Sequence, residues 1–127
     1  MSGNNLYVGC MTGTSVDGLD LALLEVDGNG GISILAASTA PLPDRLREDL
    51  LKLSQPGNDD IDLLGTCDAA LGRFTATAIA TFVEDLGYKK QSIHAIGSHG
   101  QTIRHRPPGT SPTPFTPSGF KGVGVSR

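Results

Sequence analysis

Residues 6–26 read LYVGCMTGTSVDGLDLALLEV, and this stretch decides the fold. Residues 6–11 are apolar enough for a short buried strand, and residues 12–18 form a small, polar, glycine-containing loop. Residues 19–26 return to strand character, with leucines alternating on one face. The Asp17-Gly18 pair suits the positive φ angles of a tight hairpin turn, so we expect two antiparallel strands around this loop.

The pattern continues outward from this hairpin as a meander. A glycine-rich turn at 27–31 leads into a third strand at 32–39. Helical spacing then replaces strand alternation over residues 44–53, where Asp44 is the expected N-cap. We therefore expect three strands followed by a short helix.

A longer helix is predicted from residue 61 to a stop at Gly87. Its expected apolar face consists of Ile61, Leu64, Cys67, Leu71, Phe74, Ala78, Phe82 and Leu86. Residues 93–98 form a further strand, so the predicted order is β-β-β-α-α-β, an α/β fold with a mixed sheet. We expect residues 1–106 to form one partial lobe, and the Pro-, Gly- and Ser-rich residues 107–127 to be exposed or disordered.

Composition excludes several classes of function. The chain of 127 residues has a formal charge of -3, so a basic face for nucleic acid is not expected. No apolar run approaches the ~20 residues of a membrane span, and residues 1–12 lack the pattern of a signal peptide. The two cysteines have no metal-binding or disulfide spacing. We expect a cytoplasmic protein with reduced, buried thiols and no nucleic-acid or membrane partner.

The loop from Gly13 to Asp20 is the first candidate site, and it contains Thr14, Ser15, Val16, Asp17, Gly18 and Leu19. A turn rich in Gly, Ser and Thr can direct several backbone N–H groups and hydroxyls at one phosphate. It is not a P-loop, because Leu19-Asp20 stands where that motif needs Lys and Ser/Thr. Asp17 and Asp20 offer oxygen ligands to a Mg²⁺ that accompanies ATP, directly or through water. On spacing alone, an ordinary hairpin remains the alternative.

The second candidate is the segment Ser98–Arg106, which follows the last predicted strand. It concentrates hydrogen-bond donors that suit a polyhydroxylated or anionic substrate, in the side chains of His99, Gln101, Thr102 and Arg104. A Ser-His hydrolase is not expected, since adjacent strand residues point to opposite faces and no nucleophile elbow is present. The spacing of the histidines fits no zinc motif.

The two segments together resemble the anhydro-N-acetylmuramic acid kinase family. Residues 9–20, GCMTGTSVDGLD, are similar to the family's first phosphate loop, and residues 97–105, GSHGQTIRH, are similar to its second signature. The resemblance covers residues 6 to about 116. It implies an actin-like ATPase fold of the ribonuclease H type, whose opening strands and helices would form the start of one lobe.

The resemblance also implies an activity. Members of this family use ATP and water to convert 1,6-anhydro-N-acetylmuramic acid into N-acetylmuramic acid 6-phosphate in bacterial cell-wall recycling. By likeness, residues 13–20 would bind ATP with Mg²⁺ near Asp17, and His99, Gln101, Thr102 and Arg104 would lie near the amino sugar. The family's general-base aspartate lies in a later segment than this chain contains. We therefore expect little turnover from the 127 residues alone.

Two alternatives stay open. One is a non-catalytic module that binds nucleotide or sugar through the same surface. The other is a different sugar kinase of the same fold, which the second signature disfavours.

Overall fold

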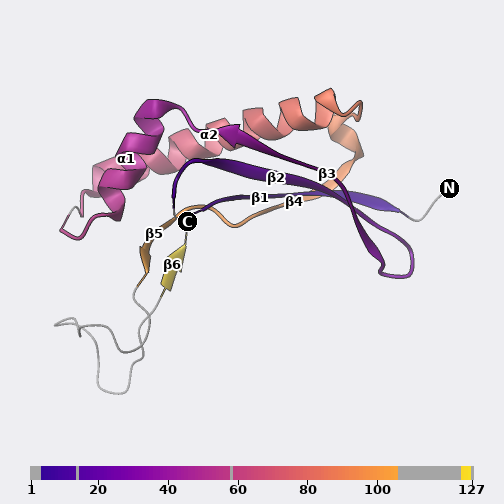
Figure 1. The fold of residues 1–127 in the computed structure, drawn as a ribbon, viewed down its shortest axis with the longest axis horizontal. Helices are drawn as coiled ribbons and strands as arrows, with labels where there is room; N and C mark the ends of the chain where they lie inside the picture. Colours follow the sequence, from indigo (N-terminus) through magenta and orange to yellow (C-terminus); the bar gives the residue numbers. More distant parts are fainter. Residues whose placement is uncertain (1–3, 14, 58, 106–123, 127) are drawn as a thin grey trace, which may run out of the picture.

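A four-stranded sheet and two helices form the two layers of the structure (Figure 1). The computed structural model describes residues 4–13, 15–57, 59–105 and 124–126. Both helices lie on the same face of the sheet, and no described element covers the other face (Figure 1). The architecture is therefore the predicted α/β arrangement.

The strands are β1 (Asn5–Thr12), β2 (Gly18–Val26), β3 (Ile32–Pro41) and β4 (Ile93–Ser98), in the spatial order β3-β2-β1-β4. β1 to β3 form an antiparallel meander, and β4 pairs in parallel with β1. The sheet is mixed, as expected, and the order β-β-β-α-α-β is confirmed. This element order and sheet topology are consistent with the start of an actin-like ATPase lobe.

Helix α1 (Asp44–Ser54) occupies the expected residues, but its N-cap differs from the prediction. Pro43 is the N-cap, since its carbonyl accepts the first helical hydrogen bond from the Arg47 N–H at 2.9 Å. Asp44 is thereby the first helical residue and caps no N–H. Its carboxylate still lies in the first turn, where the helix dipole favours a negative charge.

Helix α2 (Ile61–Asp85) has both of its ends defined by local sequence. The Asp60 side chain accepts a hydrogen bond from the Leu63 N–H at 3.0 Å. At the other end, Gly87 has φ +87° and donates to Glu84 O, while Tyr88 donates to Val83 O. These two bonds make a Schellman motif and confirm the predicted stop.

The core lies between the helices and the facing side of the sheet. Alternate residues of β1 and β2 supply Val8, Cys10, Leu19, Leu21 and Leu23, which are all buried. The helices add Leu46, Leu50, Leu53, Cys67, Ile79, Phe82 and Val83. The prediction that Ile61 and Leu86 belong to the buried face of α2 is wrong, since their side chains are 78% and 40% exposed.

Two short strands lie beyond the predicted elements. β5 (Thr102–His105) and β6 (Gly124–Ser126) pair antiparallel in a separate two-stranded sheet. A 3₁₀ turn at Lys90–Ser92 lies earlier in the chain, just before β4. The sequence predicted neither strand, and β6 falls within the stretch expected to be exposed or disordered. The rest of that stretch, 107–123 and 127, lies outside the described residues. None of the described helices is long and apolar enough to cross a bilayer.

Candidate functional site

The two segments that the sequence singled out meet at one edge of the sheet. Because β1 and β4 are parallel, their carboxyl ends lie side by side. The His99 N–H donates to Cys10 O at 3.0 Å, and the Thr12 hydroxyl donates to Gly100 O at 3.2 Å. Thr12 is only 3% exposed and Gly100 is half-buried, so this second contact is partly shielded from water. The residues that lead into the phosphate-loop candidate, Cys10 and Thr12, are therefore hydrogen-bonded to His99 and Gly100 of the second signature.

The loop between β1 and β2 does not turn where the sequence predicted. Gly18 already belongs to β2, and the positive φ angle, 56°, is at Val16, whose N–H donates to Gly13 O at 3.0 Å. Gly18 is required for a different reason. A Cβ added there would lie 2.8 Å from Thr39 Cγ2 and 2.9 Å from Ala40 O, so the glycine permits close approach of β3.

The residues assigned to ATP binding divide into exposed and buried sets. Ser15 and Asp17 are exposed, and in the described part of the chain their N–H groups have no hydrogen-bond acceptor. The side chains of Val16 and Leu19 are 0% and 2% exposed and belong to the core. Thr14 lies outside the described residues. Direct contact with a ligand is therefore open to Ser15 and Asp17, and closed to the side chains of Val16 and Leu19.

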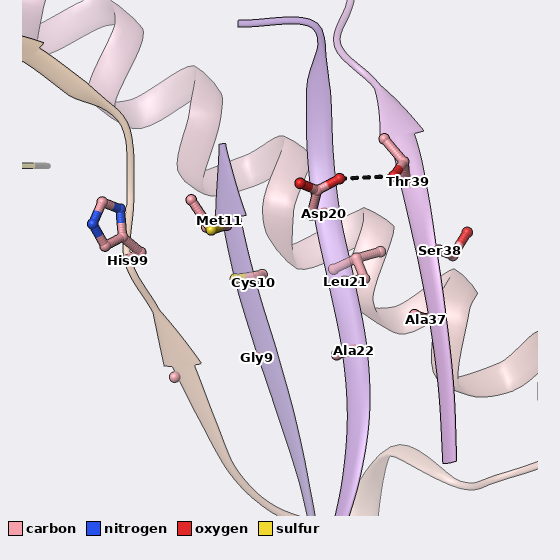
Figure 2. Close-up of a pocket in the computed structure, with 11 residues that line it drawn as sticks. Gly9, Cys10, Met11, Asp20, Leu21, Ala22, Ala37, Ser38, Thr39 and His99 are labelled. Atoms are coloured by element: carbon pink, nitrogen blue, oxygen red, sulfur yellow. Dashed lines mark hydrogen bonds between the residues drawn. The ribbon is translucent and has the colours of Figure 1, made fainter. Parts of the chain in front are cut away.

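Asp20 stands on the uncovered face of the sheet. It pairs with Thr39 across β2 and β3, and the Thr39 hydroxyl donates to Asp20 Oδ1 at 2.7 Å (Figure 2). This bond orients the carboxylate while leaving its second oxygen directed toward solvent-accessible space, since Asp20 is exposed. Asp20 is the only predicted loop residue whose carboxylate is held by a neighbouring strand in the described structure.

An open groove of about 680 Å³ runs across this face next to Asp20. Four small residues from neighbouring strands make its floor in one register: Gly97, Gly9, Ala22 and Ala37. Asp20 and Thr39 stand at one side of the groove and His99 at the other, with Met11 between them (Figure 2). Its volume is within the range of small-molecule sites.

The residues assigned to the sugar are placed differently from one another. His99 is exposed, and its Nδ1 lies 3.3 Å from Gly100 O. Gln101 is only 1% exposed, donates from Nε2 to Thr102 O at 3.0 Å, and has an Oε1 with no partner in the described residues. It borders a small internal cavity between α1 and α2. Thr102 is half-buried in β5. Only His99 of these three presents its side chain openly.

Arg104 has a structural role. Its guanidinium donates to Leu53 O at 3.3 Å and to Gln55 O at 2.8 Å, and it pairs with Asp59 at 2.8 Å. These carbonyls belong to the carboxyl end of α1, where the helix leaves acceptors without intrahelical donors. The contacts tie β5 to the connection between the helices, so they do not support the sugar contact expected for Arg104.

Arg47 is a site residue that the sequence did not indicate. From the first turn of α1, its Nε donates to Val16 O at 3.1 Å, and a terminal nitrogen lies 3.6 Å from Asp17 Oδ1. The contact joins positions 31 residues apart, and no local motif marks it. The tertiary position of α1, which packs on α2 and β5, brings Arg47 to the loop.

Both thiols are buried, although Cys10 is among the residues that line the groove. Cys10 and Cys67 are both free and buried, as predicted. Burial, together with the negative charge of Asp49, raises the pKa of Cys67, which keeps it in the thiol form at neutral pH. The described residues contain no group of three or more His, Cys, Asp or Glu side chains that could hold a metal by themselves.

Comparison with known proteins gives consistent results. Residues 5–116 match the family model described as anhydro-N-acetylmuramic acid kinase. The chain is 46% identical over 104 residues to the anhydro-N-acetylmuramic acid kinase of Shewanella pealeana, which is 82% of this chain and 28% of that protein. It is 47% identical over 110 residues to the kinase of that name in Xylella fastidiosa (84% of this chain, 29% of that protein). The corresponding protein of Coxiella burnetii is 42% identical over 106 residues, which cover 84% and 28% of the two chains. The chain thus spans less than a third of the length of these relatives.

Proposed function

The chain belongs to the anhydro-N-acetylmuramic acid kinase family, and from that membership we propose that it carries the phosphate-binding part of an ATP-dependent sugar kinase. The proposed overall reaction transfers the γ-phosphoryl group of ATP to 1,6-anhydro-N-acetylmuramic acid, opens its anhydro ring with water, and yields N-acetylmuramic acid 6-phosphate and ADP. The proposed setting is cell-wall recycling in the cytoplasm. The observation that carries the proposal is that the end of β1, from which the loop at 13–18 leaves, is hydrogen-bonded to His99 and Gly100 just after β4.

The loop supplies donors for the ATP phosphates. Ser15 and Asp17 are exposed residues whose N–H groups have no acceptor in the described residues, and Ser15 adds a hydroxyl. At Gly13, an added Cβ would meet no atom within 4 Å, so the main chain there is open to a ligand. Phosphoryl transfer depends mainly on positioning and electrostatic stabilisation, which such a loop provides.

A magnesium ion fits this loop only as a companion of the nucleotide. Mg²⁺ commonly binds through one or two carboxylates together with substrate phosphates and water. Asp20, oriented by Thr39, would face the ion or its water shell, and Asp17 would act through water. The ion's chemistry would be to neutralise charge on the phosphates.

For the sugar, His99 is the residue that the geometry supports best. Its exposed imidazole stands at the side of the groove opposite Asp20 (Figure 2). Gln101 and Arg104 act on the fold, because their side chains are directed at the interior and at the end of α1. We expect Thr102 to influence the sugar site through the position of β5.

Calorimetric titration of the 127-residue chain with Mg-ATP tests the phosphate site. Binding should occur, inorganic tripolyphosphate should compete for it, and adenosine should not. Gly13→Ala should weaken binding, because its Cβ enters the space that a phosphate would occupy, without straining the fold. Gly28→Ala is the matched control, since its Cβ also meets nothing and it lies in the distant β2–β3 turn. Absence of heat at millimolar Mg-ATP would refute the proposal.

A further inference from the structure

The contact between α1 and the phosphate-loop candidate explains how an unfavourable backbone conformation is maintained. Val16 is β-branched and has φ 56°, a region that such residues rarely adopt. Its side chain is completely buried, and its carbonyl accepts from Arg47 Nε at 3.1 Å. The loop therefore depends on two tertiary contacts rather than on glycine.

The same hydrogen bond determines the direction of a donor. In a planar trans peptide, the carbonyl and the following N–H point in opposite directions. Because Arg47 holds the Val16 carbonyl, the N–H of Asp17 must point away from α1. That N–H has no acceptor in the described residues and is one of the two donors assigned above to the phosphates.

Arg47 also offsets a charge that opposes anion binding. A terminal nitrogen lies 3.6 Å from Asp17 Oδ1, and the Asp17 side chain is 73% exposed. Where no Mg²⁺ lies between them, a carboxylate at this position repels a polyphosphate, and the nearby guanidinium weakens that repulsion. At such exposure the ion pair is weak, so the carbonyl contact is the stronger of the two effects.

We propose that Arg47 is a positioning residue for the phosphate loop: it holds the Val16–Asp17 peptide so that the Asp17 N–H faces a bound polyphosphate. This inference rests on the proposed function for its ligand, a nucleotide polyphosphate. The part of the inference that concerns the orientation of the Val16–Asp17 peptide does not depend on that function. Arg47 acts through the main chain of Val16 and has no assigned contact with the reacting atoms.

The test uses Arg47→Ala and Arg47→Lys, with Arg45→Ala as the matched control. Arg45 is on the same helix, its side chain is 86% exposed, and its ion pair is with Asp49 one turn away. Amide NMR spectra of the ligand-free chain should show the Asp17 signal displaced in Arg47→Ala and unmoved in Arg45→Ala. Affinity for Mg-ATP should fall about tenfold in Arg47→Ala, by loss of one charge-assisted hydrogen bond. Arg47→Lys keeps the charge but not the planar fork, so it should recover only part of the affinity.

An Asp17→Asn background separates the two effects of Arg47. If Arg47 acts through the Val16 carbonyl, Arg47→Ala still lowers affinity in that background, whereas pure charge neutralisation predicts no further loss. An unmoved Asp17 amide signal in Arg47→Ala overturns the proposal, even if the wild type binds Mg-ATP. Failure of the wild type to bind Mg-ATP refutes the proposed function, while the amide signal still decides the positioning role. Should Arg47→Ala not fold, Arg47→Lys provides the same comparison.

Discussion

Gly18→Ala should destabilise the protein although it adds only one methyl group. The new Cβ would lie 2.8 Å from Thr39 Cγ2 and 2.9 Å from Ala40 O, both closer than real Cβ atoms come. Rotating Thr39 relieves the first contact but withdraws its hydroxyl from Asp20, which it reaches at 2.7 Å. The second contact is with backbone, so β3 itself must shift. Overpacking of this kind costs about 1–3 kcal/mol.

Gly9→Ala is the matched control for this prediction. Gly9 is also a strand residue, but a Cβ there meets nothing within 4 Å, because it projects over the open groove. Replacing a strand glycine by alanine without strain should stabilise the fold by about 0.5–1 kcal/mol. Urea unfolding followed by far-UV circular dichroism should therefore place the two variants on opposite sides of the wild type, with midpoints separated by on the order of 1 M. Equal midpoints, or a less stable Gly9→Ala, would refute the packing argument.

Three further predictions concern stability. Gly87→Ala should lose about 1–2 kcal/mol in the same unfolding experiment, because φ +87° is unfavourable for a residue with a Cβ; Gly72→Ala, in the exposed middle of α2, should gain up to about 1 kcal/mol instead. Arg104→Ala should cost about 1.5–3 kcal/mol by leaving the carbonyls at the end of α1 without a donor; its affinity for Mg-ATP should stay at the wild-type value, and a selective loss of affinity would contradict the structural role. The raised pKa of Cys67 should stabilise the fold fully below the ordinary thiol value of 9.0, and this contribution should vanish as pH rises through the folded value, so Cys67→Ala should flatten the alkaline decline in unfolding free energy.

The parts of the fold that the sequence predicts are those set by short-range patterns. Leucine alternation identifies β2 and the face it buries, and helical spacing identifies α1 and α2. Gly87 marks the end of α2 by local chemistry, since a positive φ angle needs no distant partner, whereas the Asp60 cap at its start was not predicted. For the same reason, the two motif segments are recognisable in the chain before their meeting in space is known.

What the sequence does not predict depends on long-range contacts. Gln101 looks like an available amide in the segment 98–106, but it is buried because β5 packs beside α1 and α2. Arg104 looks like a ligand donor, but its guanidinium contacts carbonyls at the end of α1 and the Asp59 carboxylate. A polar side chain near a strand end can therefore serve either the ligand or the fold. Residue type does not distinguish these roles, whereas the position of the neighbouring helix does.

The turn of the phosphate loop lies at Val16 instead of the predicted Asp17-Gly18 pair, and the close approach of β3 to Gly18 explains this difference. Gly18 is needed where β3 comes within contact of β2, so it is extended strand and cannot also supply the positive φ angle. That angle occurs instead at Val16, where a β-branched residue is unfavourable unless its surroundings hold it. Burial of the Val16 side chain anchors one side of this peptide, and Arg47 anchors its carbonyl. The approach of β3, the packing of α1 and the direction of the Asp17 N–H are consequently linked, so Gly18→Ala and Arg47→Ala should disturb the same amide from opposite ends of the loop.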